Sequence, residues 1–220
     1  MSLLIKVGGS LMREPGVLDA VLGKVSDISS ERHIILVAGG GALADEVRRL
    51  DSTFKLPAEV SHRMALIALD QNGLVLSSKI KQSHVTSELE SIKGKGCGVS
   101  VFLPSDFALS EEAISNSWDF TSDSVAAYTA GCIGLSQLIL LKDVDGLFSQ
   151  DPKNHQEARL IRQADASTLS GFESLCIDNK LSEILLRFNL TCFILNGRHP
   201  ERLAEFSASK KFRGTMILPK

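Results

Sequence analysis

Two glycine-rich segments of the chain each follow a short apolar run, Leu3–Val7 in one case and His33–Ala38 in the other. The segments consist of Gly8, Gly9 and Ser10, and of Gly39, Gly40 and Gly41. Glycine loops at strand ends leave backbone N–H groups free to converge on phosphate oxygens, so the pattern favours a ligand crevice at one sheet edge. Neither segment has the Walker or the GxGxxG spacing, and a tight turn is the other interpretation of each cluster taken alone.

Lys6 lies two residues before the first glycine, inside an otherwise apolar run. Burying an unpaired ammonium group is costly, so this lysine needs either an anion or a route to water. In one interpretation it reaches over the glycine loop toward a phosphoryl group. In the other it lies on an edge strand with its ammonium group in solvent.

A second charged segment, Lys142-Asp143-Val144-Asp145-Gly146, follows an apolar run at 138–141. Alternate residues of an extended chain face the same side, which predicts that Asp143 and Asp145 lie together. Such a pair could contact a ribose or Mg²⁺, and Lys142 could contact a phosphate. A plain acidic turn is the other interpretation, and the spacing of a calcium-binding EF-hand loop is missing.

The elements that must position these side chains alternate between strands and helices along the whole chain. Strands are predicted at Leu3–Val7, His33–Ala38, 99–103, 138–141, 192–195 and 215–218. Helices are predicted over 17–28, over 43–50, over 58–81, from 121–123 onward, over Leu181–Phe188 and after Pro200. This alternation predicts an α/β fold, a three-layer αβα sandwich with a mostly parallel central sheet.

Composition limits the possible partners and compartments. The 220 residues carry 24 Lys and Arg against 26 Asp and Glu, so an extended basic face for nucleic acid or anionic membrane is not expected. No stretch approaches the roughly 20 apolar residues of a membrane span. The four cysteines are far apart, which predicts neither a zinc site nor a disulfide framework, and we expect a cytoplasmic protein.

Five segments, taken in order, resemble the signature segments of the amino acid kinase superfamily. They are KVGGS at 6–10, AGGG at 38–41, TSDS at 121–124, KDVDGLF at 142–148 and GT at 214–215. The resemblance implies a single amino acid kinase domain over 1–220, carbamate kinase-like in fold. It also implies an acceptor lobe at about 1–134 and a nucleotide lobe at about 135–220.

The resemblance further implies roles for individual residues. Lys6 would stabilise the transferring phosphoryl group, and Asp123 would orient the active-site lysines by ion pairing. Gly8, Gly9 and Ser10 would line the phosphates of ATP, which binds with Mg²⁺. Residues facing the nucleotide would be Lys142, Asp143, Asp145, Gly146 and Phe148. Gly39, Gly40 and Gly41 would hold the phosphate end of the acceptor.

One departure from the family pattern concerns a second phosphate-binding lysine. Many relatives carry it in a GxGGMxxK segment, whereas this chain reads Cys-Ile-Asp-Asn-Lys over 176–180. Lys180 is the candidate for that role, and an ordinary surface lysine is the other interpretation.

Three further stretches, at 61–70, 117–124 and 195–202, resemble the branch of the superfamily that phosphorylates (5-(aminomethyl)furan-3-yl)methyl phosphate in methanofuran biosynthesis, together with its bacterial relatives in one-carbon metabolism. The resemblance implies transfer of the ATP γ-phosphoryl group to a phosphomonoester. Substrate contacts are then expected from Arg48 and His62 as cations, from Asp70 to an amine, from Trp118 as a flat wall for a furan ring, and from Thr121. The other interpretations are a solvated helix arginine for Arg48, a histidine satisfied within its own helix for His62, and core packing for Trp118.

Other acceptors and one other class of protein stay open. A nucleoside monophosphate or isopentenyl phosphate could be the acceptor, although the polar 61–70 segment does not favour an isoprenoid tail. The fold also occurs in nucleotide-binding storage and regulatory proteins that catalyse no reaction. The presence of both Lys6 and Asp123 argues against that interpretation. By analogy with relatives we expect a homo-oligomer.

Overall fold

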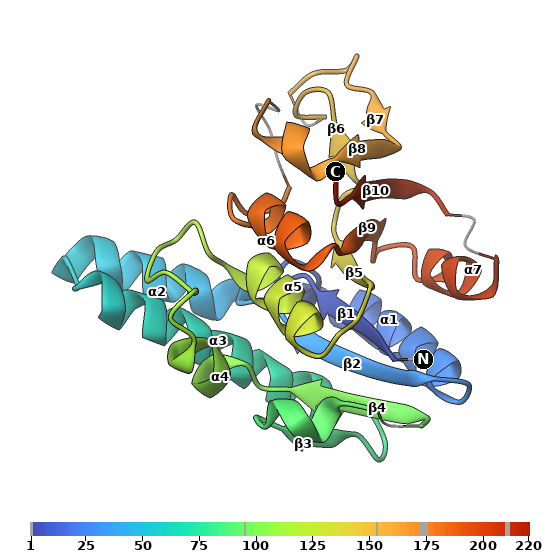
Figure 1. Ribbon diagram of the computed structural model, residues 1–220, viewed down its shortest axis with the longest axis horizontal. Coiled ribbons are helices and arrows are strands. Elements are labelled where there is room, and N and C mark those ends of the chain that lie inside the picture. The colour runs from blue at the N-terminus through green and yellow to red at the C-terminus, as the bar shows by residue number, and fades with distance from the viewer. Residues whose placement is uncertain (1, 95, 153, 172–175, 210–211) are drawn as a thin grey trace.

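The computed structural model of the chain describes residues 2–94, 96–152, 154–171, 176–209 and 212–220 (Figure 1). Within these residues, eight strands form one sheet in the order β3-β4-β2-β1-β5-β9-β10-β8, and β6 pairs with β7 in a separate small sheet. Every neighbouring pair in the large sheet is parallel except β9 with β10. The strands are β1 Leu3–Val7, β2 His33–Ala38, β3 His84–Thr86, β4 Gly98–Phe102, β5 Gln137–Lys142, β6 Leu147–Phe148, β7 Leu160–Ile161, β8 Gln163–Asp165, β9 Thr191–Asn196 and β10 Gly214–Leu218.

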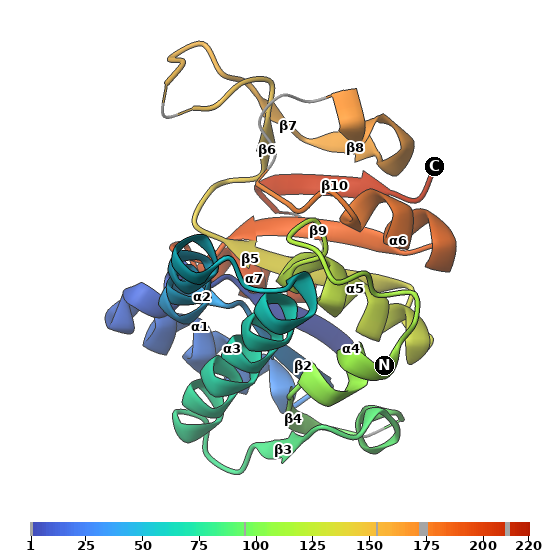
Figure 2. The ribbon, with the colours of Figure 1, turned by 90° about the vertical axis from the view of Figure 1, so that its left-hand side faces the viewer.

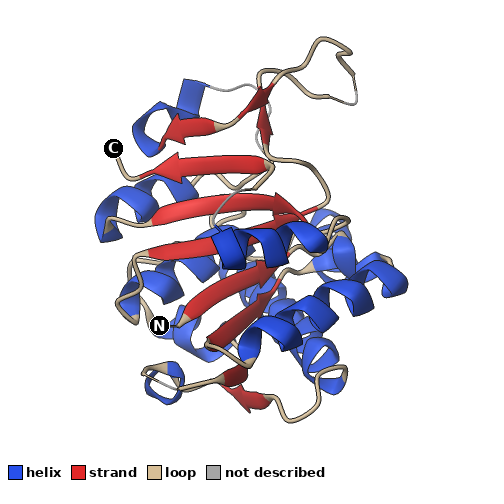
Figure 3. Ribbon diagram, turned by 90° about the vertical axis from the view of Figure 1, so that its right-hand side faces the viewer, coloured by secondary structure: helices blue, strands red, loops and turns tan. Residues whose placement is uncertain are grey.

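Helices cover both faces of the large sheet, as the views from its two sides show (Figures 2 and 3). In Figure 1, α1 and α7 lie on one side of the strands, and α3, α4, α5 and α6 lie on the other. The α-helices are α1 Pro15–Ser29, α2 Gly41–Phe54, α3 Ala58–Ser78, α4 Ser105–Ser110, α5 Ser122–Cys132, α6 Leu181–Phe188 and α7 Glu201–Ser209. Short 3₁₀ helices occur at Leu11–Arg13, Leu89–Ile92 and Ala166–Gly171. The predicted three-layer α/β sandwich with a mostly parallel sheet is confirmed.

The two faces of the sheet belong to two separate apolar cores. Along β1, Leu3, Ile5 and Val7 pack into the core beneath α1 and α7, whereas Leu4 packs into the core beneath α5 and α6. Strand alternation places Lys6 on the same side as Leu4, facing α5. Because β1 is an interior strand and Lys6 is only 3% exposed, the edge-strand interpretation of this lysine is wrong.

Helices α2 and α3 form an antiparallel hairpin that projects from the sheet at the left of Figure 1. Lys55 closes α2 in the left-handed conformation, with φ +51°, and Pro57 precedes the first turn of α3. The hairpin begins directly at the second glycine loop, so it brings its side chains to the carboxyl ends of β1 and β2. Within the described residues, none of the helices combines the length and apolar character that crossing a membrane requires.

Candidate active site

The two glycine loops pack against each other at the carboxyl ends of β1 and β2. A Cβ atom on Gly39 would lie 2.6 Å from the backbone nitrogen of Gly9, and one on Gly9 would overlap the backbone of Gly41. Gly41 also has φ +52°, a conformation that other residues adopt only with strain. Glycine is therefore required here by close backbone approach as well as by the turn.

Not every glycine N–H is available to a ligand. Gly8 donates to the Leu141 carbonyl and Gly39 donates to the Val7 carbonyl, each at 2.8 Å, so both extend the sheet. Gly39 lines none of the described cavities. The expected phosphate contacts therefore fall to the remaining loop residues, Gly9, Ser10, Gly40 and Gly41, which line a common cavity. On α3, the buried Asn72 amide donates to the Gly39 and Gly40 carbonyls and fixes the second loop.

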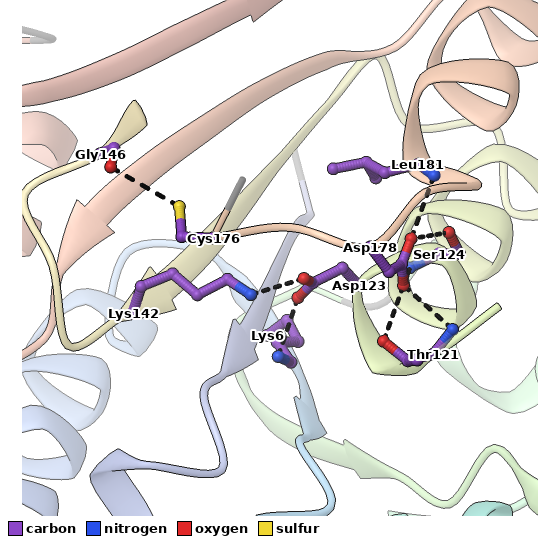
Figure 4. A network of polar contacts seen from close by, with 9 residues as sticks. All are labelled: Lys6, Thr121, Asp123, Ser124, Lys142, Gly146, Cys176, Asp178 and Leu181. Atoms are coloured by element: carbon purple, nitrogen blue, oxygen red, sulfur yellow. Dashed lines mark hydrogen bonds and ion pairs between the residues drawn. The ribbon is translucent and has the colours of Figure 1, made fainter. Parts of the chain in front are cut away.

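One buried carboxylate holds two lysines just beyond these loops (Figure 4). The Lys6 ammonium group lies 2.8 Å from one oxygen of Asp123, and the Lys142 ammonium group lies 2.5 Å from the other. Lys6 comes from β1, Lys142 from the end of β5, and Asp123 from the first turn of α5. We call these three residues the triad. With two ammonium groups and one carboxylate, it presents a net positive charge.

The charges of the triad depend on one another. Burial alone would raise the pKa of Asp123, but the Lys142 and Lys6 ammonium groups outweigh it and lower that pKa to about 2. Burial lowers the pKa of Lys6, which the Asp123 charge only partly offsets. For Lys142, burial acts in the same direction, but Asp123 outweighs it and the pKa is raised. Asp123 is therefore ionised at neutral pH and keeps the Lys142 ammonium group charged.

Asp178, which sequence reasoning missed, holds the turn that carries Asp123. Its carboxylate accepts hydrogen bonds from the N–H and hydroxyl of Thr121, from the N–H and hydroxyl of Ser124, and from the Leu181 N–H (Figure 4). It thereby caps α5 and α6 together. Burial and the neighbouring Asp123 charge raise its pKa. Its position in the 176–180 segment, where the family pattern predicts a phosphate-binding lysine, was the signal that the sequence offered.

Two cavities lie on either side of the triad. Cavity A, of about 360 Å³, lies between the α2–α3 hairpin and residues 117–122. Cavity B, of about 330 Å³, lies over the ends of β1 and β5. Gly9 and Ser10 line both, and a more open hollow lined by Lys6, Asp123 and Lys142 runs between them.

Cavity B collects most of the residues expected to face a nucleotide. Its lining includes Gly8, Lys142, Asp143, Gly146 and Phe148. Gly146 has φ +146°, and a Cβ atom there would overlap the Thr215 hydroxyl. That hydroxyl accepts from the Leu147 N–H and donates to the Ile161 carbonyl, so the closing Gly-Thr pair of the sequence supports this turn.

Cys176 also lines cavity B, where its thiol donates to the Gly146 carbonyl at 3.6 Å (Figure 4). Burial raises the pKa of this thiol to about 11. It therefore contributes a neutral wall rather than a nucleophile.

Asp145 does not join Asp143. Its carboxylate pairs with Arg202 at 2.6 Å and Arg213 at 2.8 Å, and it lines none of the described cavities. The expectation that the two carboxylates share a side is wrong, because β5 ends at Lys142 and residues 143–146 form a bend instead of an extended strand. Asp145 joins the bend to the base of α7.

Cavity A carries a pair of arginines that share one carboxylate. Arg13 and Arg48 both bind Asp45, Arg48 at 3.0 Å, and all three line the cavity. The Arg48 guanidinium group also lies 4.6 Å from the centre of the Trp118 ring, which forms part of the wall. Arg13 and Asp45 were not anticipated from the sequence, where they carried no pattern of their own. Thr121 lines the cavity as well.

His62 lines cavity A, but not as a cation. Burial lowers its pKa, and the hydrogen bond to the Ser117 carbonyl only partly opposes this. Asp70 lies outside the cavity, where its carboxylate accepts from the N–H and hydroxyl of Ser105 and caps α4. Asp70 follows His62 by eight positions, which turns the helix by about 80° beyond two full turns, so the two side chains diverge.

Lys180 is exposed and pairs with Glu183 one turn along α6, at 2.8 Å. It lines none of the described cavities. The structure instead brings Lys142 to the carboxylate that Lys6 binds.

The arrangement suits the transfer of a charged group between two bound anions. Backbone N–H groups and the first turns of α2 and α5 face cavity A, whose lining includes Gly41 and Ser122, and the two lysines lie between the cavities. Fixed positive charge at that point favours a transition state whose negative charge is spread over the transferring group.

A model of the amino acid kinase family matches residues 1–196 of the chain. The chain is 28% identical over 211 residues to (5-(aminomethyl)furan-3-yl)methyl phosphate kinase of Methanocaldococcus jannaschii, covering 94% of this chain and 93% of the relative. It is 27% identical over 256 residues to glutamate 5-kinase of Alcanivorax borkumensis, covering 98% of this chain and 66% of that protein.

Among solved structures, uridylate kinase from Archaeoglobus fulgidus superposes with a TM-score of 0.79 at 21% identity. The match covers 99% of this chain and 100% of the other. The likeness extends across the whole sheet and both helical layers.

Proposed function

Because the chain belongs to the amino acid kinase family, we propose that it transfers the γ-phosphoryl group of ATP to a small phosphomonoester, forming a diphosphate. The observation that carries the proposal is the triad, in which Asp123 holds the Lys6 and Lys142 ammonium groups between cavities A and B. A protein that only stored or sensed a nucleotide would have no need for two lysines at that junction.

We assign ATP to cavity B, which Gly8, Gly9 and Ser10 line. A Cβ atom at Gly8 would overlap the Leu141 carbonyl, so glycine lets the loop pack close to the end of β5 beside this cavity. Lys6 and Lys142 also line it and supply positive charge. Magnesium bound to the donor would neutralise part of its phosphate charge. Asp143, which lines this cavity, is the carboxylate that would contact Mg²⁺ or the ribose.

We assign the phosphomonoester to cavity A, with its phosphate near Gly40, Gly41 and the first turn of α2. Bringing two anions together costs about 4 kcal/mol for each unit pair at 4 Å and an effective dielectric near 20. Arg13 and Arg48 line the same cavity and share only one carboxylate between them, which suits a dianionic phosphate better than a carboxylate acceptor.

In the reaction, the residues of this chain position and neutralise charge. Lys6 and Lys142 would contact the transferring phosphoryl group, and Asp123 would keep their ammonium groups aimed at the junction. The acceptor is already a phosphate oxygen anion, so no general base is needed to activate it. Catalysis then rests on alignment and on electrostatic stabilisation of the transferring group.

The acceptor we favour is (5-(aminomethyl)furan-3-yl)methyl phosphate, in a methanofuran-type pathway of one-carbon metabolism. Similarity to a kinase named for that substrate supports it, as do the aromatic and polar walls of cavity A. A nucleoside monophosphate is the alternative acceptor, supported by the fold shared with uridylate kinase. Isopentenyl phosphate is a less favoured acceptor, because His62 and Ser117 place polar groups where its isoprenoid tail would lie.

Coupled measurement of ADP release across a panel of phosphomonoesters tests the proposal. The aminomethylfuran phosphate should give the highest kcat/KM, above UMP, isopentenyl phosphate and glutamate. Lys142→Met should lower kcat by about 100-fold to 1,000-fold, the usual cost of removing one group that stabilises transition-state charge. ATP binding without ADP release for any acceptor would overturn the kinase proposal in favour of a binding protein.

The acceptor and nucleotide lobes, at about 1–134 and 135–220, stay a prediction that follows from this assignment of cavities. Homo-oligomer formation and a cytoplasmic location also stay predictions. For the first, the outer face of the α2–α3 hairpin offers a candidate interface, because Phe54, Ile67 and Leu74 are exposed there.

A further inference from the structure

Cavity A has a graded charge along its length, and helix α2 sets the gradient. Gly41 lies at the first turn, Asp45 and Arg48 follow on the same side, and Asp51 lies one turn further on. Ten residues of helix span about 15 Å from Gly41 to Asp51. The helix dipole adds positive potential at the Gly41 end and negative potential near Asp51.

Beyond Trp118, cavity A is continued by a smaller cavity C of about 140 Å³. His62, Ser117 and Trp118 line both, and Asp51, Ser61 and Asn116 line cavity C alone. The two spaces are therefore neighbours, with the indole ring as a shared wall. A flat acceptor lying along that ring would direct its far end toward Asp51.

Asp51 differs from the other acidic residues of α2 in its partners. Asp45 pairs with two arginines and Glu46 pairs with Arg49. Among the described residues, no lysine, arginine or histidine forms an ion pair with the Asp51 carboxylate, which accepts a hydrogen bond from the neutral Trp118 indole N–H at 3.1 Å. Its negative charge is thus left without a cationic partner beside a cavity.

From this gradient we propose that the acceptor is zwitterionic, with its phosphate at Gly41 and a cationic amine bound by Asp51 beside Trp118. The proposal rests on the proposed function and deepens it by naming the residue that selects the far end of the acceptor. It moves the amine contact from Asp70, whose carboxylate caps α4, to Asp51. Trp118 would then serve twice, as a wall for the acceptor and as the donor that orients the carboxylate.

A pair of acceptors that differ only in the amine tests this assignment. We would compare (5-(aminomethyl)furan-3-yl)methyl phosphate with (5-methylfuran-3-yl)methyl phosphate, in ADP release and in calorimetric binding to the protein without nucleotide. A charge-assisted hydrogen bond should favour the amine about tenfold in kcat/KM and in Kd. Asp51→Asn should remove that preference, because it lowers kcat/KM and binding for the aminated acceptor about tenfold more than for the deaminated one.

Glu46→Gln is the matched control, because it removes an acidic charge from the same helix at a position that lines none of the described cavities. It should keep the tenfold preference. Trp118→Phe keeps an aromatic wall but removes the indole N–H, and it should weaken the preference without abolishing it. Thermal unfolding of each variant checks that the fold is retained.

The outcomes separate this inference from the proposed function. Equal losses of kcat/KM and binding for both acceptors in Asp51→Asn would overturn the amine contact while leaving phosphoryl transfer in place. So would a natural protein that does not prefer the aminated acceptor. Tighter binding of the amine without any ADP release would support the contact and overturn the kinase proposal. If neither acceptor binds, both ideas fail.

Discussion

At the scale of single residues, the site depends on a carboxylate with two cationic partners. Asp123 is 3% exposed, and each of its oxygens meets a different lysine. The pairing of Lys6 with Asp123 was expected from the family resemblance. The approach of Lys142 to the same carboxylate was not, because it depends on β1 and β5 being neighbours in the sheet, and no local pattern records that.

We predict that Asp123→Asn destabilises the protein by about 3–5 kcal/mol at pH 7, because two buried ammonium groups lose their counter-charge. The pKa of Asp123 is lowered from 3.8 to about 2 in the fold. Its stabilisation is therefore complete above about pH 4 and is lost as the pH falls toward 2. Urea unfolding at several pH values should show that the free energies of unfolding of the natural protein and of Asp123→Asn converge in that range. A difference in unfolding free energy that is constant with pH would contradict the role of the ionised Asp123 carboxylate. Glu183→Gln, which removes the carboxylate of an exposed ion pair, is the control.

At the scale of elements, apolar runs located the longer strands, and helical spacing of apolar residues located the longer helices. The bounds of β1, β2 and α6 agree with the prediction, and α1, α2, α3 and α5 appear where expected. The short elements β3, β6, β7, β8 and α4 were missed, because strands of two or three residues form no apolar run of usable length and a six-residue helix shows less than two turns of periodicity. Asp178 was missed for a different reason, because its bonds to Thr121 and Ser124 join segments more than 50 residues apart, which no local pattern records.

We predict that Asp178→Asn lowers kcat more than it raises the KM for ATP. An amide has one acceptor oxygen in place of two, so the first turns of α5 and α6 cannot both stay capped, and Asp123 shifts relative to the lysines. Steady-state kinetics with varied ATP provide the measurement, and Asp178→Glu should recover part of the loss. Equal effects on kcat and KM would indicate general destabilisation, which a fall in thermal midpoint would accompany.

At the scale of the whole molecule, the α2–α3 hairpin projects from the sheet (Figure 1) and carries several exposed apolar side chains. Val60, Ile67 and Leu74 repeat every seven residues along α3 and are exposed, and Phe54 at the end of α2 is 68% exposed. The opposite side of the same hairpin lines cavity A through Leu66 and Leu69. An apolar row of this kind is typical of a surface covered in an assembly.

We predict that the protein self-associates through this row. Ile67→Lys should lower the assembly state in sedimentation velocity, since it places a charge at the centre of the row without changing the lining of cavity A. Leu186→Lys, which alters an exposed leucine of similar exposure on α6, should leave the assembly unchanged. A monomeric natural protein, or equal behaviour of both variants, would contradict the prediction.

The small overlap between the linings of the two cavities has a consequence for how such a protein diversifies under selection. Cavity A is built mainly from α2, α3 and residues 117–122, and cavity B mainly from strand ends and the 143–148 segment. Among the residues that the structure describes, Gly9 and Ser10 are the two that line both. With the acceptor and donor assigned to the two cavities as proposed, mutations that change the choice of acceptor can accumulate on one side while the residues that bind the donor are inherited unchanged. A duplicated copy of this gene could acquire a new substrate through substitutions on two helices and one loop.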